Sequence, residues 1–118
     1  MRELTEHQVN PVNDPLKVYA IDEPGSGGAN HHYAVSCATG NGVDIRFQNG
    51  RIAEVGINGL THKALLAIIA DRLRAFQAGP YVCRENALAL TKIEEAMHWL
   101  HHRTRARMAR GVEGTHEK

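Results

Sequence analysis

Residues 84–110 read RENALALTKIEEAMHWLHHRTRARMAR, and this stretch decides the fold of the C-terminal half of the chain. Apolar side chains recur in it at steps of three and four residues, which predicts one face of a long helix. These positions are Leu90, Ile93, Met97 and Leu100. The same steps taken beyond Leu100 reach Arg103 and Arg107, so roughly the same face becomes cationic downstream. We therefore expect a local anion-binding site near the end of this helix.

A shorter apolar pattern precedes this helix and predicts a partner for it. Its positions are Leu65, Ile68, Ile69, Leu73 and Phe76. Thr61 is expected to cap the start of this first helix. Gly79-Pro80 is expected to end it, because proline cannot continue the helical hydrogen bonds. Since only a short connection separates the two patterns, they are predicted to pack as an antiparallel helical hairpin.

The residues before the helices predict a small antiparallel sheet. Lys17–Asp22 is expected as a first strand, and the alternation over His31–Cys37 predicts a second. Asn49-Gly50 favours a type I′ turn, so Val43–Gln48 and Arg51–Ile57 are predicted to pair as a hairpin. The expected fold is therefore α+β, with a small antiparallel sheet followed by a two-helix antiparallel hairpin.

The length of 118 residues suits a single domain over 1–118. Within it we expect an irregular or extended N-terminal segment over 1–15, a sheet part over 16–58, the helical hairpin over 60–110 and a tail over 111–118. Only six aromatic residues (one Trp, three Tyr and two Phe) are present, so the predicted core is thin and aliphatic. Help from contacts between subunits is expected.

The charge balance argues against a polyanionic partner. With 14 basic and 13 acidic residues, the formal net charge is +1, which favours neither nucleic acid polymers nor a membrane surface. The longest apolar run, Ala64–Ala70, is far shorter than the roughly 20 residues of a membrane-spanning helix. Cys37 and Cys83 show no metal-binding spacing, and no signal peptide is apparent, so a reducing cytosol is expected.

The sequence offers little sign of catalysis or of a metal. Eight histidines are present, but the adjacent pairs His31-His32 and His101-His102 have diverging side chains, so no metal site and no cofactor are expected. No nucleophile elbow frames a serine or cysteine, and an enzyme is not favoured. The glycine-rich segment Gly25–Gly28 lacks the dinucleotide and phosphate-loop patterns and is interpreted as a flexible contact loop.

Two other functional classes stay open at this point. A small nucleic-acid-binding module would use Arg103–Arg110 as its anchor. A small hydrolase of cyclic nucleotides would use His31 or His32 as an acid–base group. Arginines near a helix C-terminus also stabilise the helix without binding any ligand.

Several motifs together resemble one family. They are Asp22-Glu23-Pro24-Gly25-Ser26-Gly27-Gly28-Ala29 before a His-Tyr strand, the segments Phe-Gln-Asn-Gly and Gly-Ile-Asn-Gly-Leu-Thr, and Arg84-Glu85-Asn86-Ala87-Leu88-Ala89-Leu90-Thr91-Lys92. From about Lys17 to Thr115, the chain resembles the phage-encoded Thoeris anti-defence sponge, first type. Its helical hairpin is similar to that of the phage anti-CBASS cyclic-oligonucleotide sponge.

This resemblance implies a non-catalytic protein in the cytoplasm of the infected bacterium. Its ligands would be cyclised ADP-ribose isomers made by TIR-domain enzymes and, in some members, cyclic di- or trinucleotides. Its other partner would be itself, in a homo-oligomer built from dimers, up to a hexamer. Neither a membrane nor a nucleic acid polymer is implied as a partner.

The resemblance also assigns residues by motif. The family's ADP-ribose contacts match Arg51, Phe76 and Asn86, and its cyclic-trinucleotide contacts match Arg103 and Arg107. Taken alone, Arg51 also suits a surface position beside a turn, Phe76 a core position, and Asn86 a helix cap. Stacking, amide recognition and phosphate pairing are the interactions that a sponge needs, because it binds without turnover.

Overall fold

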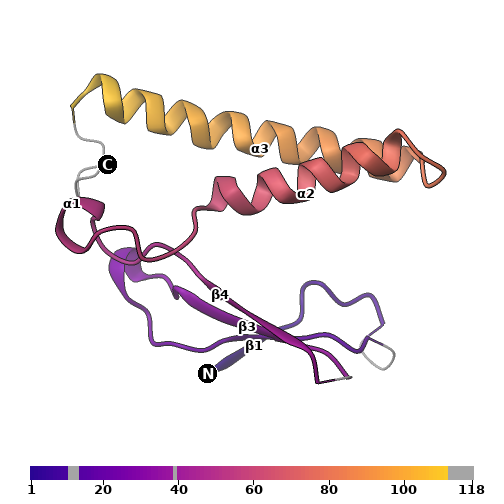
Figure 1. Cartoon of the computed structure of the whole chain (residues 1–118), viewed down its shortest axis with the longest axis horizontal. Helices are drawn as coiled ribbons and strands as arrows, with labels where there is room; N and C mark the ends of the chain where they lie inside the picture. Colours follow the sequence, from indigo (N-terminus) through magenta and orange to yellow (C-terminus); the bar gives the residue numbers. More distant parts are fainter. Residues whose placement is uncertain (11–13, 39, 112–118) are drawn as a thin grey trace. The chain divides into compact units, whose positions relative to one another are not determined.

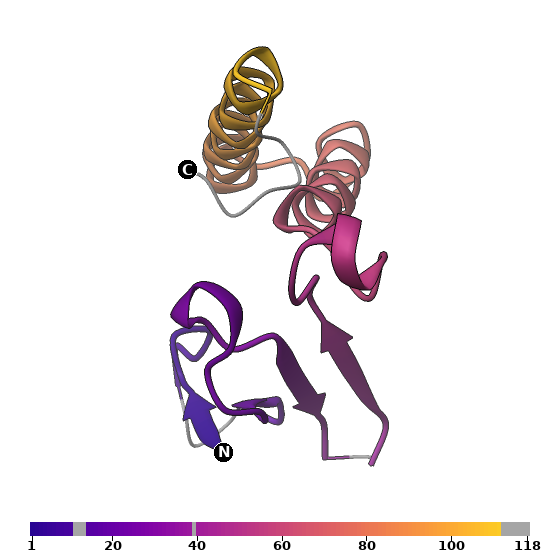
Figure 2. The ribbon, with the colours of Figure 1, turned by 90° about the vertical axis from the view of Figure 1, so that its left-hand side faces the viewer.

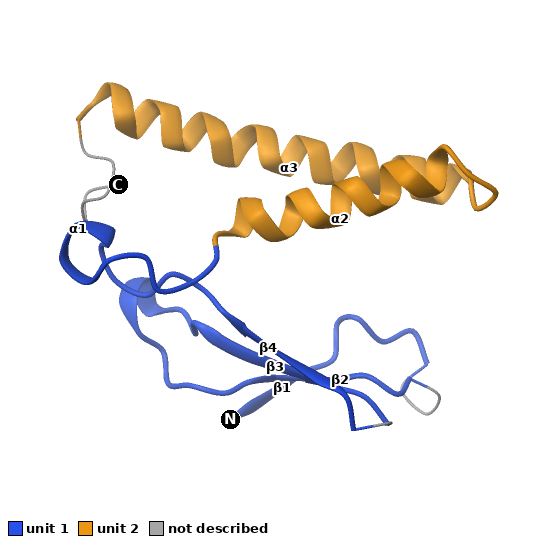
Figure 3. Ribbon diagram, viewed as in Figure 1, with its two compact units in different colours: residues 1–60 blue, residues 61–118 orange. Residues whose placement is uncertain are grey.

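The computed structural model of the chain describes residues 1–10, 14–38 and 40–111. It confirms the predicted α+β class, since a four-stranded antiparallel sheet is followed by helices. The chain divides into two compact units, Met1–Leu60 and Thr61–Lys118, called unit 1 and unit 2 (Figure 3). That the chain folds as one domain stays a prediction.

Unit 1 contains the sheet (Figure 1), and its strands follow each other in the order β1-β2-β3-β4. The strands are β1 (Arg2–Leu4), β2 (Lys17–Ala20), β3 (His32–Ser36) and β4 (Gly42–Arg46). Apolar residues meet across the strands, with Val18 opposite Val35 and Tyr33 opposite Ile45. Ala20 is 1% exposed. The small core of unit 1 therefore lies along the two central strands.

The N-terminal segment, which was expected to be irregular or extended, contains the short strand β1. β1 pairs with β2 so that Leu4 lies opposite Val18 and Arg2 opposite Ala20. Three residues are too few to show a period of two, and the edge of β2 offers unpaired backbone groups that recruit them. Sequence periodicity therefore missed β1, because pairing rather than propensity forms it.

The predicted hairpin around Asn49-Gly50 is wrong. Gly50 does turn the chain at a φ of 93°, but Ile52–Val55 then forms the short helix α1 instead of a strand. Phe47 makes a parallel bridge with Leu60 instead of pairing with Ile52. Side-chain amides in this segment bond to backbone groups, and such bonds compete with a strand ladder. The hairpin that does form joins β3 to β4.

Unit 2 is the predicted helical hairpin, with α2 (His62–Gln77) and α3 (Arg84–Ala109) side by side (Figure 2). The Thr61 side chain caps α2 as predicted, its Oγ1 accepting from the Ala64 N–H at 3.1 Å. Lys63 Nζ donates to Thr104 Oγ1 at 2.8 Å, and Arg74 lies 2.9 Å from Glu94. These two contacts, at opposite ends of α2, join the antiparallel helices.

The predicted apolar stripe is half-buried throughout α3 but only in part of α2. All four predicted positions of α3 are half-buried, as expected. In α2, however, Ile68 and Ile69 are 64% and 44% exposed, whereas Ala70 is 0% exposed. Ala70 shares a helical face with Lys63 and Arg74, which are both tied to α3. Residues 64–70 are all apolar, so their pattern does not predict which face of α2 packs against α3. The small side chain of Ala70 allows the two helices to approach each other closely.

No helix in the described part of the chain is long and apolar enough to cross a membrane.

In unit 1, the glycine-rich segment forms the short 3₁₀ helix η1 (Ser26–Gly28), where Gly27 and Gly28 take φ values of 73° and 80°. A side chain at either position would be strained, which explains the glycines.

Candidate functional site

Four side chains gather where α2 turns into α3, and we call them the tip cluster: Arg72, Phe76, Tyr81 and Asn86. The rings of Phe76 and Tyr81 meet edge to face, with centroids 5.6 Å apart. The Arg72 guanidinium lies over the Phe76 ring, 4.9 Å from its centroid. Asn86 Nδ2 donates to the Tyr81 carbonyl at 3.4 Å. Two predicted ligand contacts, Phe76 and Asn86, thus meet through Tyr81.

The connection between the helices is held by Gln77. Its Nε2 donates to the Cys83 carbonyl, and its Oε1 accepts from the Cys83 N–H, both at 3.1 Å. Cys83 also caps α3, its Sγ accepting from the Asn86 N–H at 3.4 Å. Asn86 is therefore not the cap, and its side-chain amide lies half-buried beside the turn. The cap of α3 is therefore the Cys83 thiol. Asn86 was the other candidate, but it lies three residues further along, inside the first turn of the helix.

Arg72 and Tyr81 are members of the cluster that sequence reasoning missed. Arg72 precedes Phe76 by four residues, a spacing that places both on one helical face and was available as a signal. Tyr81 is 68% exposed in the connecting turn. An exposed aromatic ring held against a half-buried one is suited to contact a planar ligand.

Arg51, the third predicted ADP-ribose contact, lies in unit 1 at the start of α1. Its guanidinium forms an ion pair with Glu54, and its side chain is 30% exposed. Among the described residues, Arg51 Nε is buried and has no hydrogen-bond partner. The side chain is thus only partly satisfied, and an anionic ligand would compete with Glu54 for it.

The loop that carries Arg51 is closed at its base by side-chain amides. Asn58 Oδ1 accepts from the Asn49 N–H at 2.8 Å, and Asn58 Nδ2 donates to the Asn49 carbonyl at 2.7 Å. Gln48 Oε1 accepts from the Asn58 N–H at 3.0 Å, and Gln48 Nε2 donates to the Gly56 carbonyl at 2.9 Å. Two amide side chains therefore replace the strand pairing that the sequence had suggested.

A pocket of about 380 Å³ adjoins the base of this loop within unit 1. We call it the unit-1 pocket, and its lining residues are Asp22, His31, His32, Arg46, Phe47, Asn49 and Asn58. Partial burial opposes ionisation of Asp22, but hydrogen bonds from the His31 and His32 backbone and from Asn30 outweigh it and lower the pKa of its carboxyl. Asp22 therefore remains an anion inside a pocket that also contains a cation.

The two predicted cyclic-trinucleotide residues differ in accessibility. Arg103 is exposed, whereas Arg107 is only 5% exposed. The stripe of α3 continues through Thr104, whose Oγ1 donates to the Leu100 carbonyl at 3.1 Å. Because Arg107 is buried, residues 103–110 do not present a continuous run of exposed arginines, which the alternative of a nucleic-acid-binding module would use as its anchor.

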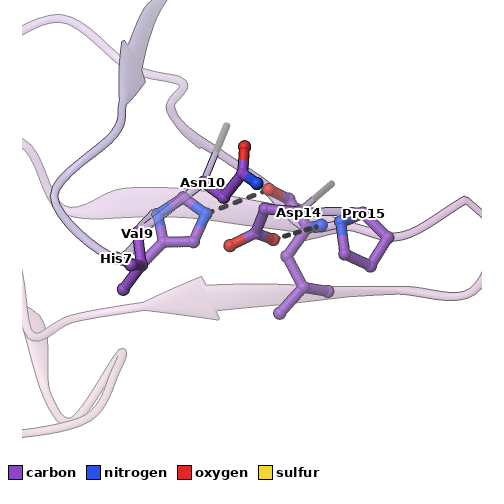
Figure 4. A pocket seen from close by; sticks show the side chains of 6 residues that line it. His7, Val9, Asn10, Asp14 and Pro15 are labelled. Atoms are coloured by element: carbon purple, nitrogen blue, oxygen red, sulfur yellow. Dashed lines mark hydrogen bonds between the residues drawn. The ribbon is translucent and has the colours of Figure 1, made fainter. Parts of the chain in front are cut away.

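A second depression, of about 350 Å³, lies in the N-terminal loop of unit 1 (Figure 4). His7 Nε2 donates to the Leu16 carbonyl at 3.0 Å, and Asp14 Oδ1 accepts from the Leu16 N–H at 2.9 Å. These polar groups hold the loop together. Within residues 1–10, 14–38 and 40–111, no group of three or more His, Cys, Asp or Glu side chains is placed to hold a metal ion.

Comparison with known proteins identifies the family. The family model described as "Acb2/Tad1, hairpin domain" matches residues 40–105, more than half of the chain. "Thoeris anti-defense 1" of Bacillus phage SBSphiJ7 is 44% identical over 110 residues, which cover 93% of this chain and 77% of that protein. The residues that the family model matches include the tip cluster and the loop that carries Arg51. The chain therefore belongs to the Thoeris anti-defence 1 family, whose helical hairpin is the Acb2/Tad1 hairpin domain.

Proposed function

We propose that this protein blocks Thoeris anti-phage defence by sequestering cyclised ADP-ribose signals without converting them. The observation that carries the proposal is the tip cluster in a member of this family. An aromatic pair, an amide and a guanidinium lie together at the connection between α2 and α3. These groups bind a base and a pyrophosphate, and none of the four side chains is suited to act as a general base at neutral pH.

Three residues are proposed as ADP-ribose contacts. Phe76 stacks on the adenine, Asn86 bonds to a base or ribose edge, and Arg51 pairs with the pyrophosphate after leaving Glu54. The relative from the Bacillus phage is named for anti-defence against Thoeris, which supports a signal of that system as the ligand. The site of action would be the cytoplasm of the infected bacterium.

A homo-oligomer built from dimers, up to a hexamer, is part of this proposal. It is supported by apolar side chains left uncovered on the hairpin. These are Ile68, Ile69, Leu88 and Trp99, exposed by 64%, 44%, 48% and 60%. Apolar surface of this kind commonly marks a protein interface. Arg103 and Arg107 are proposed to bind cyclic di- or trinucleotides at a separate site, which would extend the protection to CBASS defence.

Calorimetry with the purified chain tests the proposal. Cyclised ADP-ribose isomers are expected to bind saturably, and the ligand released by heating the complex is expected to be chemically unchanged. Linear ADP-ribose serves as the control, and it should bind more weakly because a flexible ligand loses more entropy. Absence of binding by every cyclised isomer would overturn the proposal, and a released product of altered mass would show an enzyme instead.

A further inference from the structure

The unit-1 pocket contains polar groups that the proposed contacts do not use. We infer that it is a phosphoribosyl subsite, in which Arg46 and Asn49 bind a phosphate group and Asp22 accepts a hydrogen bond from a ribose hydroxyl. The inference rests on the proposed function for the identity of the natural ligand. The pocket residues themselves determine the chemical class of the group that binds.

Arg46 provides the positive charge. It is the last residue of β4 and lies opposite His32 in the sheet, so its backbone is fixed. Its carbonyl accepts from the Leu60 N–H at 2.8 Å. The guanidinium is exposed and has no hydrogen bond or ion pair with any described residue. A planar fork of donors at the edge of a pocket suits the oxygens of a phosphate.

Asn49 supplies a second donor. Its backbone N–H and carbonyl are both bonded to the Asn58 side chain, whereas its own amide makes no hydrogen bond to a described residue. That amide lies against Gly25, where an added Cβ would come within 3.3 Å of Asn49 Oδ1 and 3.2 Å of His31 Cδ2. Gly25 thus leaves space beside the Asn49 side chain, and the position of that side chain is set by the hydrogen bonds of the Asn49 backbone.

Asp22 retains capacity to accept a hydrogen bond. Its Oδ1 accepts from Asn30 Nδ2 and from the N–H groups of His31 and His32, at 3.4, 3.2 and 3.2 Å. Its Oδ2 accepts only from the His31 N–H, at 3.0 Å. Because the His31 N–H is shared between the two oxygens, the carboxylate accepts from three donors in all. A carboxylate has about four acceptor sites, so Oδ2 can accept one more hydrogen bond. Carboxylates recognise ribose in this way, through its hydroxyl groups.

The remaining lining explains why a sugar phosphate fits better than a base. Phe47 is the one aromatic ring besides the two imidazoles, and its edge-to-face contact with Tyr33 at 5.8 Å already orients it. The pocket is therefore assigned to a sugar phosphate and not to a base. A volume of about 380 Å³ is within the range of small-ligand sites.

The two imidazoles provide reporters for a direct test. His31 Nε2 donates to the Ser26 carbonyl at 2.9 Å, and His32 Nε2 lies 3.2 Å from Asp44 Oδ1. Both rings are thus anchored beside the proposed phosphate position. We expect ribose 5-phosphate to shift their nuclear magnetic resonance signals saturably in the full chain. Ribose alone and inorganic phosphate alone should require at least about tenfold higher concentrations, because each makes only part of the contacts.

Arg46→Gln should weaken ribose 5-phosphate binding about tenfold or more, because a charge-assisted fork is lost. Asn49→Ala should weaken it less. Arg105→Gln is the matched control, since Arg105 is exposed and makes no hydrogen bond or ion pair with a described residue. Thermal unfolding of each variant establishes that it folds. Unchanged histidine signals with ribose 5-phosphate, in wild-type protein that is folded, would overturn the inference.

The same variants separate this inference from the proposed function. If wild type binds cyclised ADP-ribose and Arg46→Gln binds it as tightly, the subsite is wrong while sequestration stands. If wild type binds no cyclised isomer but ribose 5-phosphate shifts both histidines, the subsite stands and the proposed function fails. Weakening of both ligands by Arg46→Gln supports the subsite.

Discussion

The tip cluster and the unit-1 pocket are built in opposite ways. The tip cluster takes its side chains from 72–86, and ring contacts hold them at an exposed turn. The unit-1 pocket takes its residues from 22–58, and hydrogen bonds to the backbone hold them. Stacking needs only a local turn, whereas a polar pocket needs a fixed sheet register. Changes in the first should therefore affect binding alone. Changes to the hydrogen-bonded side chains of the second, such as Asp22 and Asn58, should affect folding as well.

The largest effect is expected from Phe76→Ala. Removing a stacked ring should weaken cyclised ADP-ribose binding roughly tenfold or more, while cyclic trinucleotides bind as before. Calorimetry with both ligands makes this measurement. Arg103→Ala is the reciprocal variant, and it is preferable to Arg107→Ala because Arg107 is 5% exposed. Equal losses of both ligands in one variant would mean a shared site.

Asn58→Ala tests whether side-chain hydrogen bonds hold the loop of unit 1. It removes two hydrogen bonds to the Asn49 backbone, which predicts a loss of about 1–3 kcal/mol in the stability of the loop. Hydrogen exchange should accelerate over 49–58 and stay unchanged in α2 and α3. Asn41→Ala, at an exposed turn position, is the control. Unaltered exchange in the loop would show that these amides do not hold it.

Acidification should affect the Asp22 region before the hairpin. Because the folded-state pKa of Asp22 is lowered, its contribution to stability is present above its unfolded pKa of about 4 and is lost as pH falls through the folded pKa. The stability difference between wild type and Asp22→Asn should therefore shrink at acidic pH. Denaturant titrations at several pH values measure it, and a difference that grows on acidification would contradict this account.

The smallest effect is expected at the ion pair between the helices. Arg74 and Glu94 are both about half exposed, so Arg74→Ala should cost no more than about 1 kcal/mol in unfolding free energy. Thermal unfolding at two salt concentrations gives the measurement. A much larger loss would show that this pair, and not apolar packing, sets the register of the hairpin.

The same contrast explains how far the sequence predicts this molecule. The helical hairpin follows from apolar spacing, the Thr61 cap and Gly79-Pro80, because these signals act within a few residues. The strand over Arg51–Ile57 was predicted wrongly, since Gln48 and Asn58 bond to backbone groups that a turn rule does not consider. Propensity rules describe local preference, whereas these amides act across ten residues.

The site follows a similar division. Phe76 and Asn86 are predicted as ligand contacts from the resemblance to the family, and the structure joins them through Tyr81. The unit-1 pocket had no sequence signal, because its residues are brought together only by the sheet and the loop. Sequence spacing also treated Arg103 and Arg107 as a pair, although their exposure differs. Helical spacing gives direction but not the burial that decides accessibility.

Native mass spectrometry of the protein with a cyclised ADP-ribose isomer is the decisive experiment for sequestration. We expect an oligomer whose mass exceeds that of the free protein by whole numbers of the unmodified ligand, and which releases the same ligand on heating. A protein mass that does not change with any cyclised isomer, or a released molecule of different mass, would contradict it.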